Sequence, residues 1–406
     1  MMVSSAGRGG ANPSMPQSIF ISAGEASGEH YGALLADALQ KQLAASGQTA
    51  SFFGMGGERM AAAGVECVVR SEDMAVMGLT EVVRHLPRIW REYRRLKQAI
   101  RDRRPSVAVL IDFPEIHFRL ARELHRLGVP VVYFVSPQLW AWKKHRIKLV
   151  RKYIDKMLVI FPFEEPFYRE QGVQAEFVGH PLAELPLPSI SRAQFAAENG
   201  LDPAKTWIGL LPGSRPKEIR DHLPEILRAA RELPGSFEFI IPLAPTLNVA
   251  QLEEVKQIAQ NCGDGVAVRL VDDARAALFH SRASIVASGT ATVEAALIGN
   301  PFVVVYRVSA LTYAIARRIV TVPHVAMANL IAGKQVVPEL IQSDFTAANI
   351  VREIEPLLPE GPPRQSMMEE LARIRGLLAK NSGASETGGA IERAAQITLE
   401  MMRRDG

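Results

Sequence analysis

Short apolar runs alternate along the chain with segments whose apolar positions recur every three or four residues. The runs predict buried strands, and the longer period predicts helices between them. In the first half the predicted strands are Ser18–Ser22, Ser51–Gly54, Val107–Ile111, Val131–Val135, Lys156–Ile160 and Ala175–Val178. In the second half they are Trp207–Leu211, Glu238–Pro242, Val266–Leu270, Ser284–Ala287 and Pro301–Tyr306. Strands that alternate with helices indicate an α/β fold with parallel sheets.

The alternation breaks at a proline-rich stretch, HPLAELPLPSIS, and then resumes. Such a stretch is typical of a linker between domains. We therefore expect two doubly wound, Rossmann-like domains that face a central cleft, at residues 18–185 and 186–365. Residues 1–17 are polar and rich in Gly, Ser and Pro, and are expected to be a disordered lead-in. Ligands of open α/β sheets bind beyond the carboxyl ends of the strands, so the chemistry is expected in the cleft.

Composition mainly excludes classes of protein. Apolar residues make up 48% and charged residues 22%, which excludes a disordered or collagen-like chain. No apolar stretch reaches the roughly 18 to 20 residues that span a bilayer. The two cysteines, Cys67 and Cys262, make neither a disulfide framework nor a zinc site and fit a reducing cytoplasm.

The net charge of +4 is unevenly placed. Nine basic residues lie between Arg84 and Arg104, against Glu92 and Asp102, and a second basic cluster runs over residues 143–156. Localised positive charge attracts nucleic acid, anionic lipid headgroups or phosphorylated substrates. A solvated helix face explains either cluster equally well.

A glycine-containing turn, GEASGE, follows the first predicted strand and opens a helix. Gly24 and Gly28 let the backbone approach a ligand, and amides at a helix N-terminus favour an anion. The turn is not a dinucleotide fingerprint, because its glycines are four apart and no acidic residue sits where a ribose partner belongs after the second strand. Packing alone accounts for the glycines but poorly for Glu25 and Ser27.

Asp112 ends the most apolar predicted strand, VAVLID. A carboxylate at that place lies at the rim of the cleft, where burial raises the pKa and suits it to act as a base. Helix capping, or pairing with a basic neighbour, explains the same residue equally well.

The turn LPGSRP follows the first strand of the second half. Pro216 suits the first position of a helix, so Gly213 and Ser214 form a turn that faces an anion. The planar guanidinium of Arg215 is then placed to bind a phosphate.

A second phosphate-type turn, SGTATVE, contains Ser288, Gly289 and Thr290 between a strand and a helix. Glu294 either accepts hydrogen bonds from sugar hydroxyls or favours the helix N-terminus electrostatically. Two such turns in one domain predict a bound nucleoside diphosphate. Neither is followed by a Walker lysine, so ATP hydrolysis is not expected.

Eight motifs together resemble the lipid-A-disaccharide synthase family in order and spacing: GEASGE, AVMGLTEV, IDFPE, VSPQLWAW, FPFE, FVGHPLAE, LPGSR and SGTATVE. Each is weak alone, but eight collinear motifs are specific, and they run from about Ser18 to near the C-terminus. The resemblance implies an inverting glycosyltransferase of the two-domain GT-B type in lipid A (lipopolysaccharide) biosynthesis. It joins UDP-2,3-diacylglucosamine to 2,3-diacylglucosamine 1-phosphate through a β-1,6 bond and releases UDP. It implies no cofactor and no metal, and the phosphate turns have no DxD-like pair or His/Cys ligand spacing beside them.

The resemblance also implies roles for single residues. Asp112 matches the essential aspartate and is the candidate general base for the acceptor 6-hydroxyl. The residues that match or adjoin the UDP-sugar site are Gly213, Ser214, Arg215, Ser288, Gly289, Thr290, Glu294 and, in VAMANLIAG, Asn329. Those of the loop expected near the acceptor or donor phosphate are Gly24, Glu25, Ser27 and Gly28.

Three positions depart from the family pattern: Glu115 and Glu29 stand where aspartate is usual, and His117 stands where asparagine is usual. His117 and His180 are alternative bases, ranked below Asp112. In the GT-B arrangement the C-terminal helices, here residues 366–406, return to the first domain. Association into a homodimer is left open.

Both implied substrates carry acyl chains, so contact with a membrane is expected. The segment MAVMGLTEVVRHLPRIW includes Val76, Met77, Leu79 and Trp90 and leads into the basic helix. Such a stretch can enter the lipid interface while its cations meet anionic headgroups, although packing in the core explains part of it. The expected location is the cytoplasm, peripheral to the inner membrane.

Three other functions compete. A UDP-N-acetylglucosamine 2-epimerase shares the two-domain architecture but does not need the apolar segment at 74–90. A transferase that adds N-acetylglucosamine to a lipid-linked muramyl acceptor is closer, but VSPQLWAW and GEASGE argue against it. Nucleic-acid binding has only the arginine run in its favour and lacks a helix-turn-helix, zinc or RNP pattern, so no nucleic-acid partner is expected.

Overall fold

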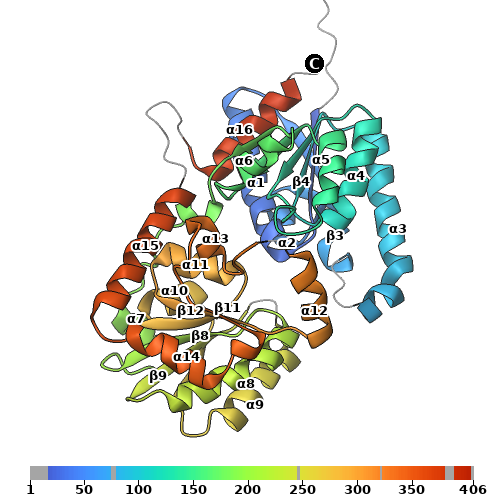
Figure 1. The fold of residues 1–406 in the computed structure, drawn as a ribbon. Helices are drawn as coiled ribbons and strands as arrows, with labels where there is room; N and C mark the ends of the chain where they lie inside the picture. The colour runs from blue at the N-terminus through green and yellow to red at the C-terminus, as the bar shows by residue number, and fades with distance from the viewer. Residues whose placement is uncertain (1–16, 75–78, 245–246, 321, 380–387, 404–406) are drawn as a thin grey trace, which may run out of the picture.

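The computed structural model describes residues 17–74, 79–244, 247–320, 322–379 and 388–403. Within these ranges the chain forms two α/β domains, each around one sheet (Figure 1). The first sheet has the strand order β3-β2-β1-β4-β5-β6-β7 and the second β10-β9-β8-β11-β12-β13. Every strand pair is parallel, as the alternation of strands and helices predicts.

The first domain contains seven strands in the described residues, β1 (Gln17–Ala23), β2 (Ala50–Gly56), β3 (Val65–Arg70), β4 (Val107–Ile111), β5 (Val131–Phe134), β6 (Lys156–Val159) and β7 (Ala175–Phe177). Its helices are α1 (Ala26–Ala45), α2 (Glu58–Ala62), α3 (Leu79–Arg103), α4 (Pro114–Arg126), α5 (Ile147–Tyr153) and α6 (Glu164–Glu170).

The second domain contains β8 (Thr206–Leu211), β9 (Phe237–Pro242), β10 (Val268–Val271), β11 (Ala283–Ala287), β12 (Phe302–Tyr306) and β13 (Glu339–Ile341). Its helices are α7 (Arg192–Asn199), α8 (Pro216–Glu232), α9 (Val249–Cys262), α10 (Ala274–His280), α11 (Thr290–Ile298), α12 (Ala310–Ile319), α13 (Met327–Ala332) and α14 (Ala347–Ile354). Two further helices follow, α15 (Pro362–Leu378) and α16 (Ala390–Arg403).

Every strand predicted from the apolar runs is confirmed within two residues of its expected bounds. All five residues of the central strand β4 are fully buried, because helices cover both faces of a parallel sheet. Two strands were not predicted, β3 and β13, and both lie at the edge of a sheet.

The two C-terminal helices go to different domains. Helix α15 packs against α11 and α13 of the second domain, whereas α16 packs against α1 of the first (Figure 1). The guanidinium of Arg393 in α16 donates two hydrogen bonds to the carbonyl of Val178, at 2.8 and 2.5 Å. The expected return to the first domain is therefore made by α16 and not by α15.

The domains meet through segments that follow strand ends. Trp140 and Ala141, which come after β5, are buried within the apolar core of the second domain together with Leu182. Tyr31 of α1 lies within electrostatic reach of Glu294 in α11. Of the helices in the described ranges, none has the length and apolar character needed to cross a bilayer.

Candidate functional site

Asp112 lies in a left-handed turn directly after β4. It and Phe113 have φ of 49° and 50°, a conformation that residues other than glycine seldom adopt. The side chain of Asp112 is half-buried. Burial, and secondarily the nearby charge of Glu25, raise its pKa to about 6, against an opposing hydrogen bond from the backbone of Phe113. Asp112 is therefore ionised at neutral pH and basic enough to accept a proton.

The turn after β1 lies against the Asp112 turn. A Cβ on Gly24 would stand 2.3 Å from a ring carbon of Phe113, so only glycine fits there. Glu25 is half-buried, Ser27 is exposed and Gly28 is buried beside Ile111. The sequence placed these two turns after different strands, and the pairing of β1 with β4 brings them together.

The two histidines considered as alternative bases are buried. Burial lowers the pKa of His117 to about 4 and that of His180 to about 3, so both rings are neutral at pH 7. Nε2 of His117 lies 2.8 Å from the hydroxyl of Ser22, and Nδ1 of His180 accepts a hydrogen bond from the amide of Leu182. Neither ring is as accessible to an acceptor hydroxyl as Asp112.

Glu115, one of the departures from the family pattern, binds two cations. Its carboxylate lies 3.0 Å from Nζ of Lys143, accepts a hydrogen bond of 2.9 Å from Nη2 of Arg146, and lies 2.8 Å from Nη1 of the same guanidinium. The hydrogen bond from Arg146 is the main reason that the pKa of Glu115 falls to about 2. Lys143 and Arg146 belong to the basic cluster at 143–156, and only the fold brings them beside the Asp112 turn.

The LPGSR turn joins β8 to α8. Gly213 has φ of 119°, and a Cβ there would lie 2.5 Å from the carboxylate of Glu218, so the turn requires glycine. Ser214 is exposed. The side chain of Arg215 is 50% exposed, and its contact with Glu218 is long, at 3.4 Å. An ion pair this open holds its arginine weakly, so the guanidinium remains available to a ligand.

The SGT turn follows β11, the strand that pairs in parallel with β8, so the two phosphate-type turns lie side by side at the edge formed by the carboxyl ends of these strands. Gly289 has φ of 151° and, like Thr290, is exposed, whereas Ser288 is half-buried. Burial raises the pKa of Glu294, which is half-buried at this edge. Glu294 also contributes to the raised pKa of Tyr31, after burial, so it lies within electrostatic reach of the first domain.

His222, which sequence reasoning did not single out, connects the loops at this edge. Its ring is fully buried, and Nδ1 donates a hydrogen bond of 2.7 Å to the carbonyl of Pro212. Nε2 accepts a hydrogen bond of 3.0 Å from the amide of Arg307, which follows β12. His222 lies seven residues after Arg215, which places it two turns into α8, and that spacing was its only signal in the sequence.

Asn329 is fully buried, and its amide group is fully hydrogen-bonded within the protein. Nδ2 donates to the carbonyl of Val337 and to Glu339, and Oδ1 accepts from the amides of Val336 and Val337. An asparagine side chain can make four such bonds, so none remains for a ligand. Any effect of Asn329 on a bound UDP-sugar is therefore indirect, through the backbone of Val336 and Val337 that it holds in place.

Among the residues expected to face the membrane, Val76 and Met77 lie outside the described residues. Leu79 begins α3, and its side chain is likewise not described. Trp90 is 49% exposed, with the guanidinium of Arg94 5.4 Å from its ring. A second exposed indole, outside the segment at 74–90, is Trp142, which is 42% exposed with Nζ of Lys143 4.0 Å from its ring.

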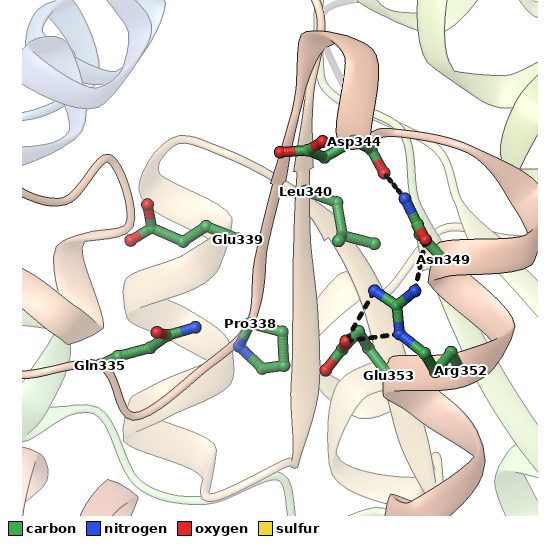
Figure 2. A pocket seen from close by; sticks show the side chains of 8 residues that line it. All are labelled: Gln335, Pro338, Glu339, Leu340, Asp344, Asn349, Arg352 and Glu353. Atoms are coloured by element: carbon green, nitrogen blue, oxygen red, sulfur yellow. Dashed lines mark hydrogen bonds and ion pairs between the residues drawn. The ribbon is translucent and has the colours of Figure 1, made fainter.

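A cavity of about 420 Å³ lies along β13, at the edge of the second sheet (Figure 2). Arg352 and Asn349 in its wall bind each other, and Arg352 pairs with Glu353. None of the residues predicted for the site lines this cavity. The candidate site is therefore the set of turns after β1, β4, β8 and β11.

Solved structures share this two-domain arrangement. A calicheamicin glycosyltransferase is 18% identical over 96% of this chain and 99% of its own, with a TM-score of 0.57. MurG from Acinetobacter baumannii is 13% identical over 95% of this chain and 100% of its own, with a TM-score of 0.55. A UDP-GlcNAc 2-epimerase from Neisseria meningitidis is 14% identical over 96% of this chain and 99% of its own, with a TM-score of 0.57. The fold is that of GT-B glycosyltransferases.

The family is shown by sequence. A family model described as lipid-A-disaccharide synthetase matches residues 19–386. The lipid-A-disaccharide synthase of Acidobacterium capsulatum is 61% identical over 95% of this chain and 96% of its own length. That of Koribacter versatilis is 51% identical over 95% and 99%. The chain belongs to the lipid-A-disaccharide synthase family, and it is a glycosyltransferase.

Proposed function

We propose that the chain transfers 2,3-diacylglucosamine from UDP to the 6-hydroxyl of 2,3-diacylglucosamine 1-phosphate, forming the β-1,6 disaccharide and UDP. The observation that carries the proposal is the pairing of two half-sites. The first domain presents a half-buried carboxylate with a pKa of about 6, and the second presents two adjacent phosphate-type turns. The identity of the sugar and of its acyl groups is inferred from membership of the lipid-A-disaccharide synthase family.

The reaction is a single displacement. The acceptor oxygen bonds to the anomeric carbon while the bond from that carbon to the diphosphate breaks. The hydroxyl proton passes to the carboxylate of Asp112, and the electron pair of the broken bond leaves with UDP. Arg215 and the amides of the turns after β8 and β11 stabilise the charge that develops on the diphosphate. Because the base and the leaving group stand on opposite domains, the attack comes from the opposite side and inverts the anomeric centre.

The phosphate of the acceptor also needs cations, and Lys143 and Arg146 supply them beside the Asp112 turn. Glu115 neutralises one of these two charges and leaves one. The carboxylate of Glu115 is 60% exposed, so an incoming phosphate can compete for the same donors. We therefore propose that this pair selects an acceptor that carries a 1-phosphate.

Arg146→Gln is expected to lower the preference for the phosphorylated acceptor over its phosphate-free analogue by about 10- to 100-fold, the effect of removing one charge-assisted hydrogen bond. The measurement compares kcat/KM for the two acceptors. Lys148→Gln removes the same charge from an exposed position of α5 and is the matched control. A preference equal to that of wild type in Arg146→Gln contradicts the assignment.

Contact with a membrane is proposed at the two exposed indoles, Trp90 and Trp142, because each has a cation beside it. The double variant Trp90→Ser/Trp142→Ser is expected to bind vesicles of phosphatidylcholine and phosphatidylglycerol about 10-fold more weakly, because it inserts less apolar surface into the lipid. Co-sedimentation measures the partition. Phe279→Ser, at a 38% exposed position of the second domain, is the control. If the double variant partitions as wild type does, these two indoles do not meet lipid.

The test of the reaction itself uses purified protein with both acylated substrates in detergent and detects disaccharide and UDP by mass spectrometry. UDP release without disaccharide means that the acceptor is a different molecule. Turnover of UDP-N-acetylglucosamine alone would favour the epimerase instead. The homodimer stays a prediction, which sedimentation equilibrium of the wild-type chain measures.

A further inference from the structure

We propose that His117 is a positioning residue for Asp112: its ring Nδ1–H holds the carbonyl of Asp112 and thereby directs the carboxylate at the acceptor hydroxyl. The proposal rests on the proposed role of Asp112 as the base. It gives a function to one of the residues that depart from the family pattern.

The turn that carries Asp112 needs external support. Asp112 and Phe113 are consecutive non-glycine residues with left-handed φ, and such a pair persists only when surrounding contacts hold it. A carboxylate is joined to its backbone by only two rotatable bonds. A change in the backbone of the turn therefore changes where the carboxylate points.

Two side chains hold the carbonyl of Asp112. Nδ1 of His117 lies 2.6 Å from this oxygen, and the hydroxyl of Tyr133 donates to it at 2.5 Å. A carbonyl can only accept, so Nδ1 carries the proton. Both side chains are fully buried.

The other ring nitrogen has a partner that suits this tautomer. With the proton on Nδ1, Nε2 is an acceptor, and the hydroxyl of Ser22 lies 2.8 Å from it. Ser22 is fully buried in β1 and comes two residues before Gly24. The relay Ser22 to His117 to Asp112 therefore links the two first-domain turns of the site.

The ring of His117 also packs against Phe113. The two rings meet edge to face with centroids 5.8 Å apart, and the ring of Phe113 in turn occupies the space beside Gly24. His117 thus contacts both left-handed residues of the turn.

Two amide variants separate a positioning role from a packing role. In His117→Asn the side-chain nitrogen takes the place of Nδ1 and can still donate to the Asp112 carbonyl. In His117→Gln the amide reaches the place of Nε2, towards Ser22, and the carbonyl loses this donor. We expect His117→Asn to keep kcat within about 5-fold of wild type and His117→Gln to lower it by about 10- to 100-fold, since small misplacements of a reacting group have effects of this size.

The KM values for donor and acceptor are expected to stay near wild type in both variants, because His117 touches neither substrate. The acid limb of the kcat/KM profile is expected to stay near pH 6 in His117→Asn. A kcat for His117→Gln equal to wild type overturns the proposal. The proposal is also overturned if both variants lose the same amount of kcat and this loss parallels a fall in melting temperature, because that result would indicate a purely structural role.

If His117→Gln does not fold, Ser22→Ala carries the test. It removes the hydrogen bond that orients the ring through Nε2 and so loosens the hold of Nδ1 on the carbonyl, and kcat is expected to fall about 3- to 10-fold. An unchanged kcat for a folded Ser22→Ala overturns the proposal. Asp112→Asn, measured alongside, tests the role of Asp112 separately from that of His117. If Asp112→Asn is fully active, the assignment of Asp112 as the base has failed. If it is inactive while His117→Gln is active, only the positioning role of His117 has failed.

Discussion

Replacement of Asp112 by asparagine lowers kcat by about 10²- to 10⁴-fold, the usual contribution of a general base. The amide has nearly the same shape as the carboxyl and still accepts a hydrogen bond from the amide of Phe113, but it cannot take the proton of the acceptor hydroxyl. Disaccharide formation in detergent, followed by mass spectrometry, measures the loss. The affinity for UDP is expected to be unchanged, because that ligand is assigned to the other domain.

The pH dependence follows from the same group. Only the ionised carboxylate accepts a proton, and the pKa of Asp112 is raised to about 6. The value of kcat/KM should therefore fall on the acid side with a midpoint near pH 6, well above the ordinary aspartate value of 3.8. A wild-type profile that stays flat down to pH 4.5 would falsify the assignment of Asp112 as the base.

The stability of Asp112→Asn distinguishes lost chemistry from lost folding. Because the folded carboxyl keeps its proton up to a higher pH than the unfolded one, ionisation of Asp112 destabilises the fold as pH rises from about 4 through 6. Asparagine does not ionise, so the variant should be more stable than wild type at pH 8 and should melt at a higher temperature. Its free energy of unfolding should be higher by at most about 3 kcal/mol. The gap should shrink towards pH 4. Asp102→Asn, at an exposed position, is the control and should change neither kcat nor the free energy of unfolding.

Replacement of Arg215 by glutamine is expected to lower kcat/KM for the donor by about 10²- to 10³-fold, since its guanidinium is assigned to charge that develops on the departing diphosphate. The structure leaves that group 50% exposed, with one long contact to Glu218, so its removal costs little stability. UDP affinity, measured by calorimetry, should weaken as well. Arg215→Lys should recover only part of the activity, because an ammonium lacks the planar fork.

Lys217 provides the control for this result. It lies two residues away, its side chain is 71% exposed, and it pairs with Asp221 on the surface of α8. Lys217→Gln removes the same charge without touching the turn, so its donor kinetics should match wild type. Equal losses in the two variants would mean that general electrostatic attraction, and not contact with the diphosphate, explains the effect of Arg215.

The apolar runs in the sequence predicted most strands of the two sheets but missed the edge strands β3 and β13. Strands such as β4 are apolar throughout because both faces are buried, and a continuous apolar run is easy to recognise. Strand β3 has only Val65 and Val69 buried among its six residues, and β13 has only three residues, so neither has a distinct pattern. Edge strands owe their conformation to the neighbour they pair with, which local sequence does not show.

The turns of the candidate site were readable from the chain because glycine, proline and charged residues at strand ends have local causes. The partners of these turns were not readable. Tyr133 meets the carbonyl of Asp112, and Ser22 meets the ring of His117, only because β1, β4 and β5 are neighbours in the sheet. Likewise Glu115 meets Lys143 and Arg146 across about 30 residues of chain. Local sequence specifies the conformation of a turn, whereas the protonation, orientation and charge of its side chains depend on groups that the order of strands in the sheet brings beside it.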